Sequence, residues 1–270
     1  MSPWRFALAC AVGTSHLKAA LPCQDAATCD VIRDERGGET LIAVASDGAG
    51  SAQRAEEGSR LACCMFVDRF ATWLNEHDLS ELTHDDMAEW VVRFQSAVTS
   101  MAEAQGLRPR EYACTLVAAL IGREVAAYFQ VGDGAMVVSP QAQPTAFDCV
   151  FWPQKGEYEN TTNFLTDPAV LERFDFLLAK GAIDEIALFT DGIQALALHY
   201  ATRTAHAPFF DGMLGAVRGA HGEGRSERLS KALEDFLRSE RVTTRTDDDK
   251  TLILASRRPV SVSPPAARVA

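Results

Sequence analysis

The chain has 270 residues, and its 26 lysines and arginines against 37 aspartates and glutamates give a formal net charge of −11. This acidic balance argues against nucleic acid as a general partner, because phosphate backbones are bound by basic surfaces. The composition, 47% hydrophobic and 23% charged, indicates a globular fold. No apolar run approaches the roughly 18 residues that a membrane span needs.

The first apolar segment alternates in character from Trp4 to Cys10, which favours a strand over a short signal peptide. The seven cysteines are odd in number and include no C-x-x-C pair. This usage is typical of a reduced chain, so we expect a cytoplasmic protein.

The remaining elements follow from hydrophobic periodicity. A strand over 40–46 precedes helices over 62–74 and 87–101, and Thr83 is the expected N-cap of the second helix. Strands over 112–121, 125–131 and 135–139, a helix over 171–178, a strand over 185–190, a helix over 229–237 and a strand over 251–255 complete the order. Because strands and helices come in blocks, the pattern indicates antiparallel sheets covered by helices. The Pro- and Ser-rich segment 257–270 is expected to be a flexible tail.

Acidic residues stand at the ends of several expected strands. Three apolar runs lead directly into Asp-Gly, at Asp47, Asp133 and Asp191, and an acidic run occupies 247–249 just before the last strand. One Asp-Gly pair by itself is a common hairpin turn. Their coincidence at strand ends of one sheet system predicts that these carboxylates meet in the fold.

A cluster of this kind needs compensation. Two carboxylates about 4 Å apart repel each other by roughly 4 kcal/mol at an effective dielectric constant of 20. Oxygen ligands favour Mg²⁺ or Mn²⁺, and two such ions would balance four carboxylates. A two-metal carboxylate site is suited to the hydrolysis of phosphate esters.

The ordered motifs resemble those of the metal-dependent protein phosphatases, the type 2C or PPM family of serine/threonine phosphatases. The resemblance extends over about residues 6–256 and includes a bacterial branch of the family. It rests on the segments 13–16, 22–25, 47–50, 113–116, 132–134, 156–166, 190–193 and 248–251.

The resemblance implies an α+β fold, a four-layer α-β-β-α sandwich of two antiparallel sheets flanked by helices, over a phosphatase domain 1–256. It implies two core Mn²⁺ or Mg²⁺ ions and a weaker third. Hydrolysis of phosphoserine or phosphothreonine would use a water that bridges the two core ions. The implied catalytic residues are Asp47, Asp191 and Asp25. The implied metal ligands are Asp47, the carbonyl of Gly48, Asp191, Asp133 and one acid of the run 247–249, of which Asp248 is placed first before Asp247 and Asp249.

The sequence departs from the family pattern at the substrate phosphate. Ala20 stands where the family has an arginine, so His16 or Lys18 would substitute, and Glu157 and Asn160 would lie on a flap beside the cleft. Ala49 and Ala195 replace a histidine and an acid of the family.

Two other functions remain open at this point. The first is a pseudophosphatase that serves as a binding or regulatory module, and the second is a two-metal hydrolase of small phosphate esters or diesters. The expected partners of the phosphatase are phosphorylated proteins and a cognate serine/threonine kinase, without nucleic acid or membrane.

Overall fold

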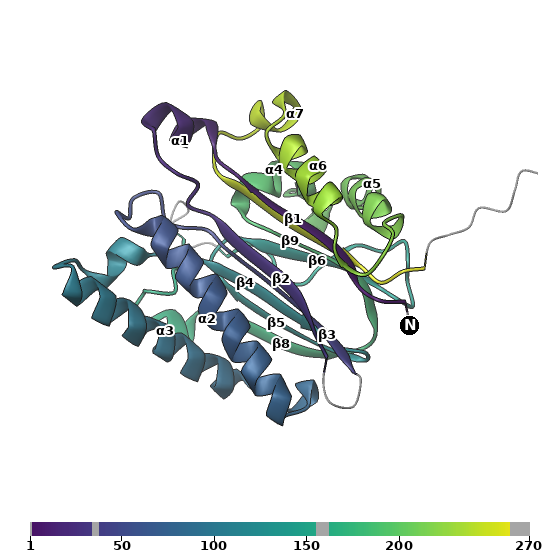
Figure 1. The fold of residues 1–270 in the computed structure, drawn as a ribbon, viewed down its shortest axis with the longest axis horizontal. Coiled ribbons are helices and arrows are strands. Elements are labelled where there is room, and N and C mark those ends of the chain that lie inside the picture. The colour runs from purple at the N-terminus through teal and green to yellow at the C-terminus, as the bar shows by residue number, and fades with distance from the viewer. Residues whose placement is uncertain (1, 34–37, 155–161, 260–270) are drawn as a thin grey trace, which may run out of the picture.

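Two β-sheets pack face to face at the centre of the structure, a computed structural model that describes residues 2–33, 38–154 and 162–259 (Figure 1). One sheet has the strand order β12-β1-β13-β9-β6-β7, with β1 Arg5–Ala11, β6 Ala135–Pro140, β7 Asp148–Cys149, β9 Ile183–Phe189, β12 Gly224–Arg225 and β13 Lys250–Ser256. The other has the order β2-β3-β4-β5-β8, with β2 Ala26–Arg33, β3 Glu39–Ser46, β4 Leu116–Ile121, β5 Val125–Val131 and β8 Asp175–Lys180. Every pairing in these sheets is antiparallel except that of β1 with β12.

Helices cover the outer face of each sheet, which confirms the expected four layers (Figure 1). The five-stranded sheet is covered by α2 (Ala55–Glu76) and α3 (His84–Ala104), and the six-stranded sheet by α5 (Ala207–Arg218) and α6 (Glu227–Leu237). Shorter elements are α1 (Thr14–Ala19), α4 (Gln194–Ala197), α7 (Glu240–Thr243) and a hairpin of β10 (Leu198–His199) with β11 (Thr204–Ala205). Single 3₁₀ turns lie at Leu79–Glu81, Pro109–Tyr112, Val170–Glu172 and Asp191–Ile193.

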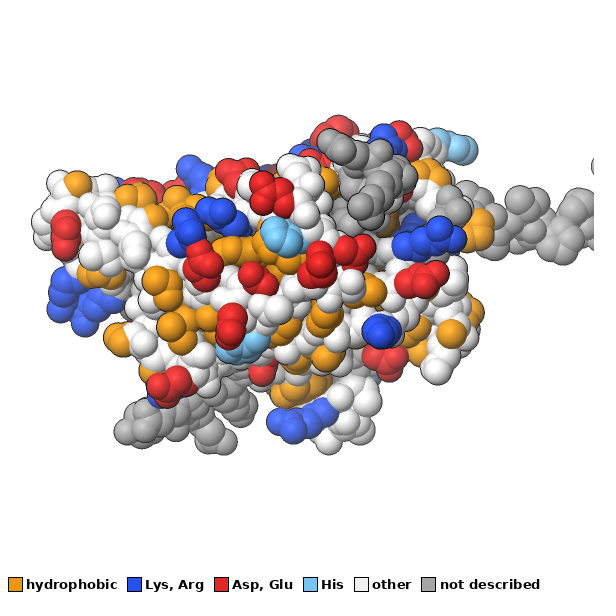
Figure 2. Space-filling model, turned by 90° about the horizontal axis from the view of Figure 1, so that it is seen from below, with side chains coloured by type: hydrophobic (Ala, Val, Ile, Leu, Met, Phe, Trp, Pro, Cys, Tyr) orange, Lys and Arg blue, Asp and Glu red, His pale blue; other side chains and the backbone are white. Residues whose placement is uncertain are grey.

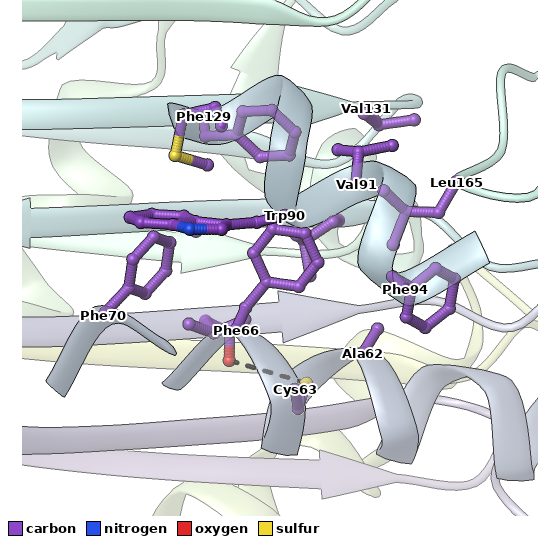
Figure 3. Packing of buried hydrophobic residues seen from close by; sticks show 14 of the residues in the cluster. Ala62, Cys63, Phe66, Phe70, Trp90, Val91, Phe94, Phe129, Val131 and Leu165 are labelled. Atoms are coloured by element: carbon purple, nitrogen blue, oxygen red, sulfur yellow. Dashed lines mark hydrogen bonds between the residues drawn. The ribbon is translucent and has the colours of Figure 1, made fainter. Parts of the chain in front are cut away.

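Three apolar layers hold the sandwich together. Between α2, α3 and the five-stranded sheet, Phe66 stacks on Phe129 with ring centroids 5.8 Å apart, and Phe70 and Trp90 meet edge to face (Figure 3). A second layer fills the space between the sheets, and a third lies under α5 and α6. Burial of this apolar surface fixes the two sheets rigidly, so their strand ends form a stable support for polar side chains.

Most sequence-based predictions of elements agree with the structure. Thr83 is the N-cap of α3, since its hydroxyl accepts a hydrogen bond from the Asp86 backbone N–H. The expected helix over 171–178 is wrong, because a 3₁₀ turn and the edge strand β8 occupy this region. In β8, Phe176 and Leu178 face the layer under α2 and α3, and Ala179 faces the other sheet. A short apolar run of this kind fits the helical spacing of 3.6 residues as well as the strand alternation of two, and the hydrogen-bonded pairing with β5 makes it a strand.

The start of the expected tail belongs to the folded body. Arg257 and Arg258 are buried, and the Arg258 guanidinium donates to Glu185 and to the hydroxyl of Ser139. The Glu185 carboxylate, which is 0% exposed, also accepts two hydrogen bonds from Arg218. A buried ionic network therefore holds Arg258 against the six-stranded sheet.

The surface reflects the acidic composition. Figure 2 shows one face on which acidic side chains are spread among hydrophobic and basic ones. Within the described residues, none of the helices combines the length and the apolar character required to traverse a bilayer.

Candidate metal centre

Several strand ends meet at one end of the sandwich and carry the acidic residues predicted from the sequence. Asp47 follows β3, Asp191 follows β9, and Asp248 precedes β13. Asp133 lies in the turn that leads from β5 in one sheet to β6 in the other. Because β9 runs antiparallel to both β13 and β6, the end of β9 and the starts of β13 and β6 lie at the same end of the sheet.

Three of these carboxylates form a compact group. One carboxylate oxygen from each of Asp47, Asp133 and Asp191 lies within 4.8 Å of the other two, and all three side chains are half-buried. In the described part of the chain, this is the group of acidic, histidine and cysteine side chains whose geometry suits a metal ion.

The electrostatics of the group are unfavourable without a cation. Burial, followed by the charges of Asp133, Asp248 and Asp25, raises the pKa of Asp191 to about 7. Burial and the charges of Asp25 and Asp191 also hold the pKa of Asp47 well above its usual range. The Asp133 pKa is raised as well, mainly by burial. Each raised pKa means that the folded chain disfavours the ionised carboxylate.

The donor set fits divalent hard cations. Oδ1 of Asp191 and Oδ1 of Asp25 are buried and have no hydrogen-bond partner among the described residues. Unpaired buried carboxylate oxygens are rare in folded proteins because their desolvation is not compensated. An all-oxygen set with such orphaned atoms matches the ligand preference of Mg²⁺ and Mn²⁺.

Asp25 is close enough for its charge to act on Asp47 and Asp191. It is 8% exposed, its Oδ2 accepts a hydrogen bond of 2.8 Å from the Thr190 hydroxyl, and burial raises its pKa to about 7. The Thr190 hydroxyl in turn accepts from the Thr251 backbone N–H at 3.0 Å. The start of β2 therefore carries Asp25 into contact with Thr190, the residue directly before Asp191.

Backbone geometry explains the glycines that follow the aspartates. A Cβ on Gly48 would lie 2.6 Å from the Ala55 carbonyl oxygen, and a Cβ on Gly192 would lie 2.0 Å from the Asp249 carbonyl oxygen. Only glycine permits these approaches. The glycines thus let the chain segments that carry Asp47 and Asp191 pack against their neighbours.

Thr115 belongs to the segment 113–116 that carries the family resemblance, but its contact with Asp47 was not predicted from the sequence. Its hydroxyl accepts a hydrogen bond of 3.0 Å from the Asp47 backbone N–H, and its own N–H donates to the Asp47 carbonyl at 2.8 Å. Nothing in the local pattern reveals the contact, because Thr115 is 68 residues away from Asp47.

Two acids of the run before β13 have different environments. Asp249 is 2% exposed, and its carboxylate accepts hydrogen bonds of 2.6 Å from the backbone N–H groups of Gly13 and Gln24. Asp248 is exposed, and its charge raises the pKa of Asp47, Asp133 and Asp191. Of these two acids, Asp248 is thus the one that remains available to a metal ion.

The predicted substrate-binding residues have different locations. His16 is half-buried, and its Nδ1 lies 2.8 Å from Oδ2 of Asp249, the acid that also accepts from the N–H groups of Gly13 and Gln24 on either side of α1. Lys18 is on the exposed side of α1. Glu157 and Asn160 lie outside the described residues.

Comparison with known proteins identifies related sequences. A family model described as protein phosphatase 2C matches residues 12–238. Serine/threonine-protein phosphatase 3 of Escherichia coli (strain K12) is 34% identical over 257 residues, which cover 93% of this chain and 98% of that protein.

Solved structures share the fold. The serine/threonine phosphatase Stp1 from Staphylococcus aureus matches with a TM-score of 0.61 and 17% identity over 95% of both chains. The serine/threonine phosphatase PstP/Ppp of Mycobacterium tuberculosis matches with a TM-score of 0.60 and 12% identity, over 94% of this chain and 98% of that one.

Proposed function

This chain belongs to the protein phosphatase 2C family of metal-dependent enzymes, and from this premise we propose that it removes phosphate from phosphoserine and phosphothreonine in proteins. The observation that carries the proposal is the group of Asp47, Asp133 and Asp191, whose carboxylate oxygens lie within 4.8 Å of one another. A fold that retains mutually repelling, half-buried acids needs a cation to stabilise them.

The proposed ligands are contributed by separate strand ends. Asp47, Asp191 and Asp248, with the Gly48 carbonyl, would hold two core ions, and Asp133 would contribute to a weaker third. Mn²⁺ or Mg²⁺ in this position supplies a Lewis acid for the phosphoryl oxygens and lowers the pKa of water toward neutrality. The ions also let an acidic protein bind an anionic phosphate, because they reverse the local potential.

The protein residues have orienting tasks in this proposal. Asp25 is fixed by Thr190 at Oδ2, so its unpaired Oδ1 is available to accept a hydrogen bond from a water in the centre. Thr115 fixes the Asp47 backbone, which holds that carboxylate in place. Ala49 cannot donate a proton to the leaving group, so this chain has less side-chain acid catalysis than the family pattern provides.

The proposal also covers the residues that bind the substrate, the partner kinase and the cellular compartment. His16 would contact the substrate near the start of α1, with Lys18 on the same exposed turn. A serine/threonine kinase that phosphorylates the same proteins is the expected counterpart. The seven cysteines are free, which supports a reducing compartment such as the cytoplasm.

A phosphothreonine peptide and an aryl phosphate test the function directly. We expect hydrolysis of both to require added Mn²⁺ and to fall at least 100-fold in Asp47→Asn and Asp191→Asn, since each removes a metal ligand. Asp85→Asn is the matched control, because this carboxylate is fully exposed at the start of α3 and should leave activity unchanged. A wild type that binds no divalent ion and equals both variants would instead indicate a pseudophosphatase. Activity on diesters alone would indicate the other two-metal hydrolase.

A further inference from the structure

The β10–β11 hairpin adjoins the metal centre through a chain of side-chain contacts. Gln194, three positions after Asp191, donates a hydrogen bond from Nε2 to the Asp133 carbonyl. Its Oε1 accepts a hydrogen bond from the Tyr200 hydroxyl. The charges of Asp191 and Asp133 reach this phenol and add to burial in raising the Tyr200 pKa. The hairpin that begins with Leu198 therefore forms part of the rim of the centre.

The rings of Trp152 and Tyr200 extend this rim, and the Arg203 guanidinium lies over the Trp152 ring. The ring of Trp152, from the segment after β7, lies edge to face with the Tyr200 ring, with centroids 5.4 Å apart and an interplanar angle of 84°. The Arg203 guanidinium carbon lies 5.9 Å from the centroid of Trp152. Tyr200 is 50% exposed and Arg203 is also exposed, so both side chains are accessible from solvent. Stacking on an indole restricts the guanidinium while leaving its N–H groups able to bind an anion.

The backbone of Arg203 has an uncommon conformation. Its φ of +53° is in the left-handed region, where asparagine or glycine is favoured and an arginine is strained. Strained backbone positions are often found at functional sites. In the described residues, the contact that engages the guanidinium is the Trp152 ring and not a carboxylate.

We propose that Arg203, supported by Trp152 and Tyr200, binds an acidic side chain that lies within a few residues of the phosphorylated serine or threonine of the substrate. This inference rests on the proposed phosphatase function and assigns its peptide specificity. A guanidinium binds a carboxylate through two parallel hydrogen bonds, which gives direction as well as attraction. On a chain with a net charge of −11, an exposed arginine on the hairpin next to an acidic centre attracts such a residue.

Peptide hydrolysis by Arg203→Asn tests the assignment. Asparagine tolerates the left-handed backbone, so this variant removes the cation without new strain. The substrates are a phosphothreonine peptide with neutral flanks, a series with one aspartate moved through the three positions on each side, and an aryl phosphate. For at least one aspartate position, we expect Arg203→Asn to lower kcat/KM about 10-fold, mainly through KM. Hydrolysis of the neutral peptide and of the aryl phosphate should not change.

Two further variants make the result specific. Arg123→Asn is the matched control, because Arg123 is in the β4–β5 turn, at the opposite end of the sheet from Asp47. Arg123→Asn should leave the ratio of kcat/KM between each aspartate-containing peptide and the neutral peptide unchanged. Arg203→Glu should reverse the preference and favour a peptide with an arginine in place of the aspartate.

The inference is overturned if Arg203→Asn matches the wild type on every aspartate-containing peptide, or if it slows the aryl phosphate by the same factor. A wild type that hydrolyses no phosphopeptide would overturn the proposed function itself, so the two failures are distinguishable.

Discussion

Replacement of Asp191 by asparagine is expected to make the metal-free protein more stable while it removes activity. In the folded chain, burial and the charges of three neighbouring aspartates raise the pKa of Asp191 from 3.8 to about 7. An amide of the same shape carries no charge, so it escapes this repulsion. The same change removes one oxygen ligand from the centre.

The size and the pH window follow from linkage. A rise of the pKa from 3.8 to about 7 corresponds to about 4 kcal/mol of destabilisation once the carboxylate is ionised. Because the side chain is half-buried, solvent screening reduces this figure, and we expect a gain of about 1 to 4 kcal/mol. The folded pKa lies above the unfolded one. The wild type therefore has no penalty below about pH 4, loses stability progressively as the pH rises from about 4 to about 7, and carries the full penalty above that.

Urea denaturation in EDTA at pH 4.5 and pH 8 measures the effect. The variant should resemble the wild type at pH 4.5 and be more stable at pH 8, and saturating Mn²⁺ should reverse the order at pH 8 because the wild type binds the ions more tightly. Asp85→Asn should show neither change, since this carboxylate is exposed and far from the cluster in sequence. An Asp191→Asn variant that is less stable than the wild type at pH 8 in EDTA would refute the reasoning.

Three further substitutions test buried contacts, one at the far end of β9 and two beside the centre. Glu185→Gln should lower the free energy of unfolding by about 3 kcal/mol, because the buried carboxylate pairs with two arginines, and an unchanged denaturation midpoint would contradict this. Gly192→Ala should lower both Tm and activity because its Cβ would lie 2.0 Å from a backbone oxygen, whereas Gly212→Ala, with no atom within 4 Å, should retain both. Asp249→Asn should lower the free energy of unfolding by about 2 kcal/mol, since two backbone N–H groups converge on its carboxylate. A calorimetric titration in which this variant loses Mn²⁺ binding but no stability would identify Asp249 as a ligand instead.

Local sequence patterns were informative where one period dominates. The strand over β5 and the helices α2 and α3 follow from their apolar spacing, and Thr83 marks the start of α3. The region of β8 misled the prediction because four apolar residues within eight positions satisfy a helical spacing. Only its pairing with β5, across a long stretch of chain, makes it a strand.

The sequence by itself determined which residues have the chemistry for a metal centre, because three Asp-Gly pairs and a final acidic run stand at the ends of apolar strands. It could not determine which acid of the run 247–249 faces the centre and which binds the segment around α1, since neighbouring carboxylates are chemically alike. The tertiary structure shows that Asp249 accepts hydrogen bonds from the backbone N–H groups of Gly13 and Gln24, whereas Asp248 stays exposed, which supports the proposal that Asp248 is the ligand. It also brought Trp152, Tyr200 and Arg203 together at the rim, because contacts between residues distant in sequence depend on the packing of the two sheets.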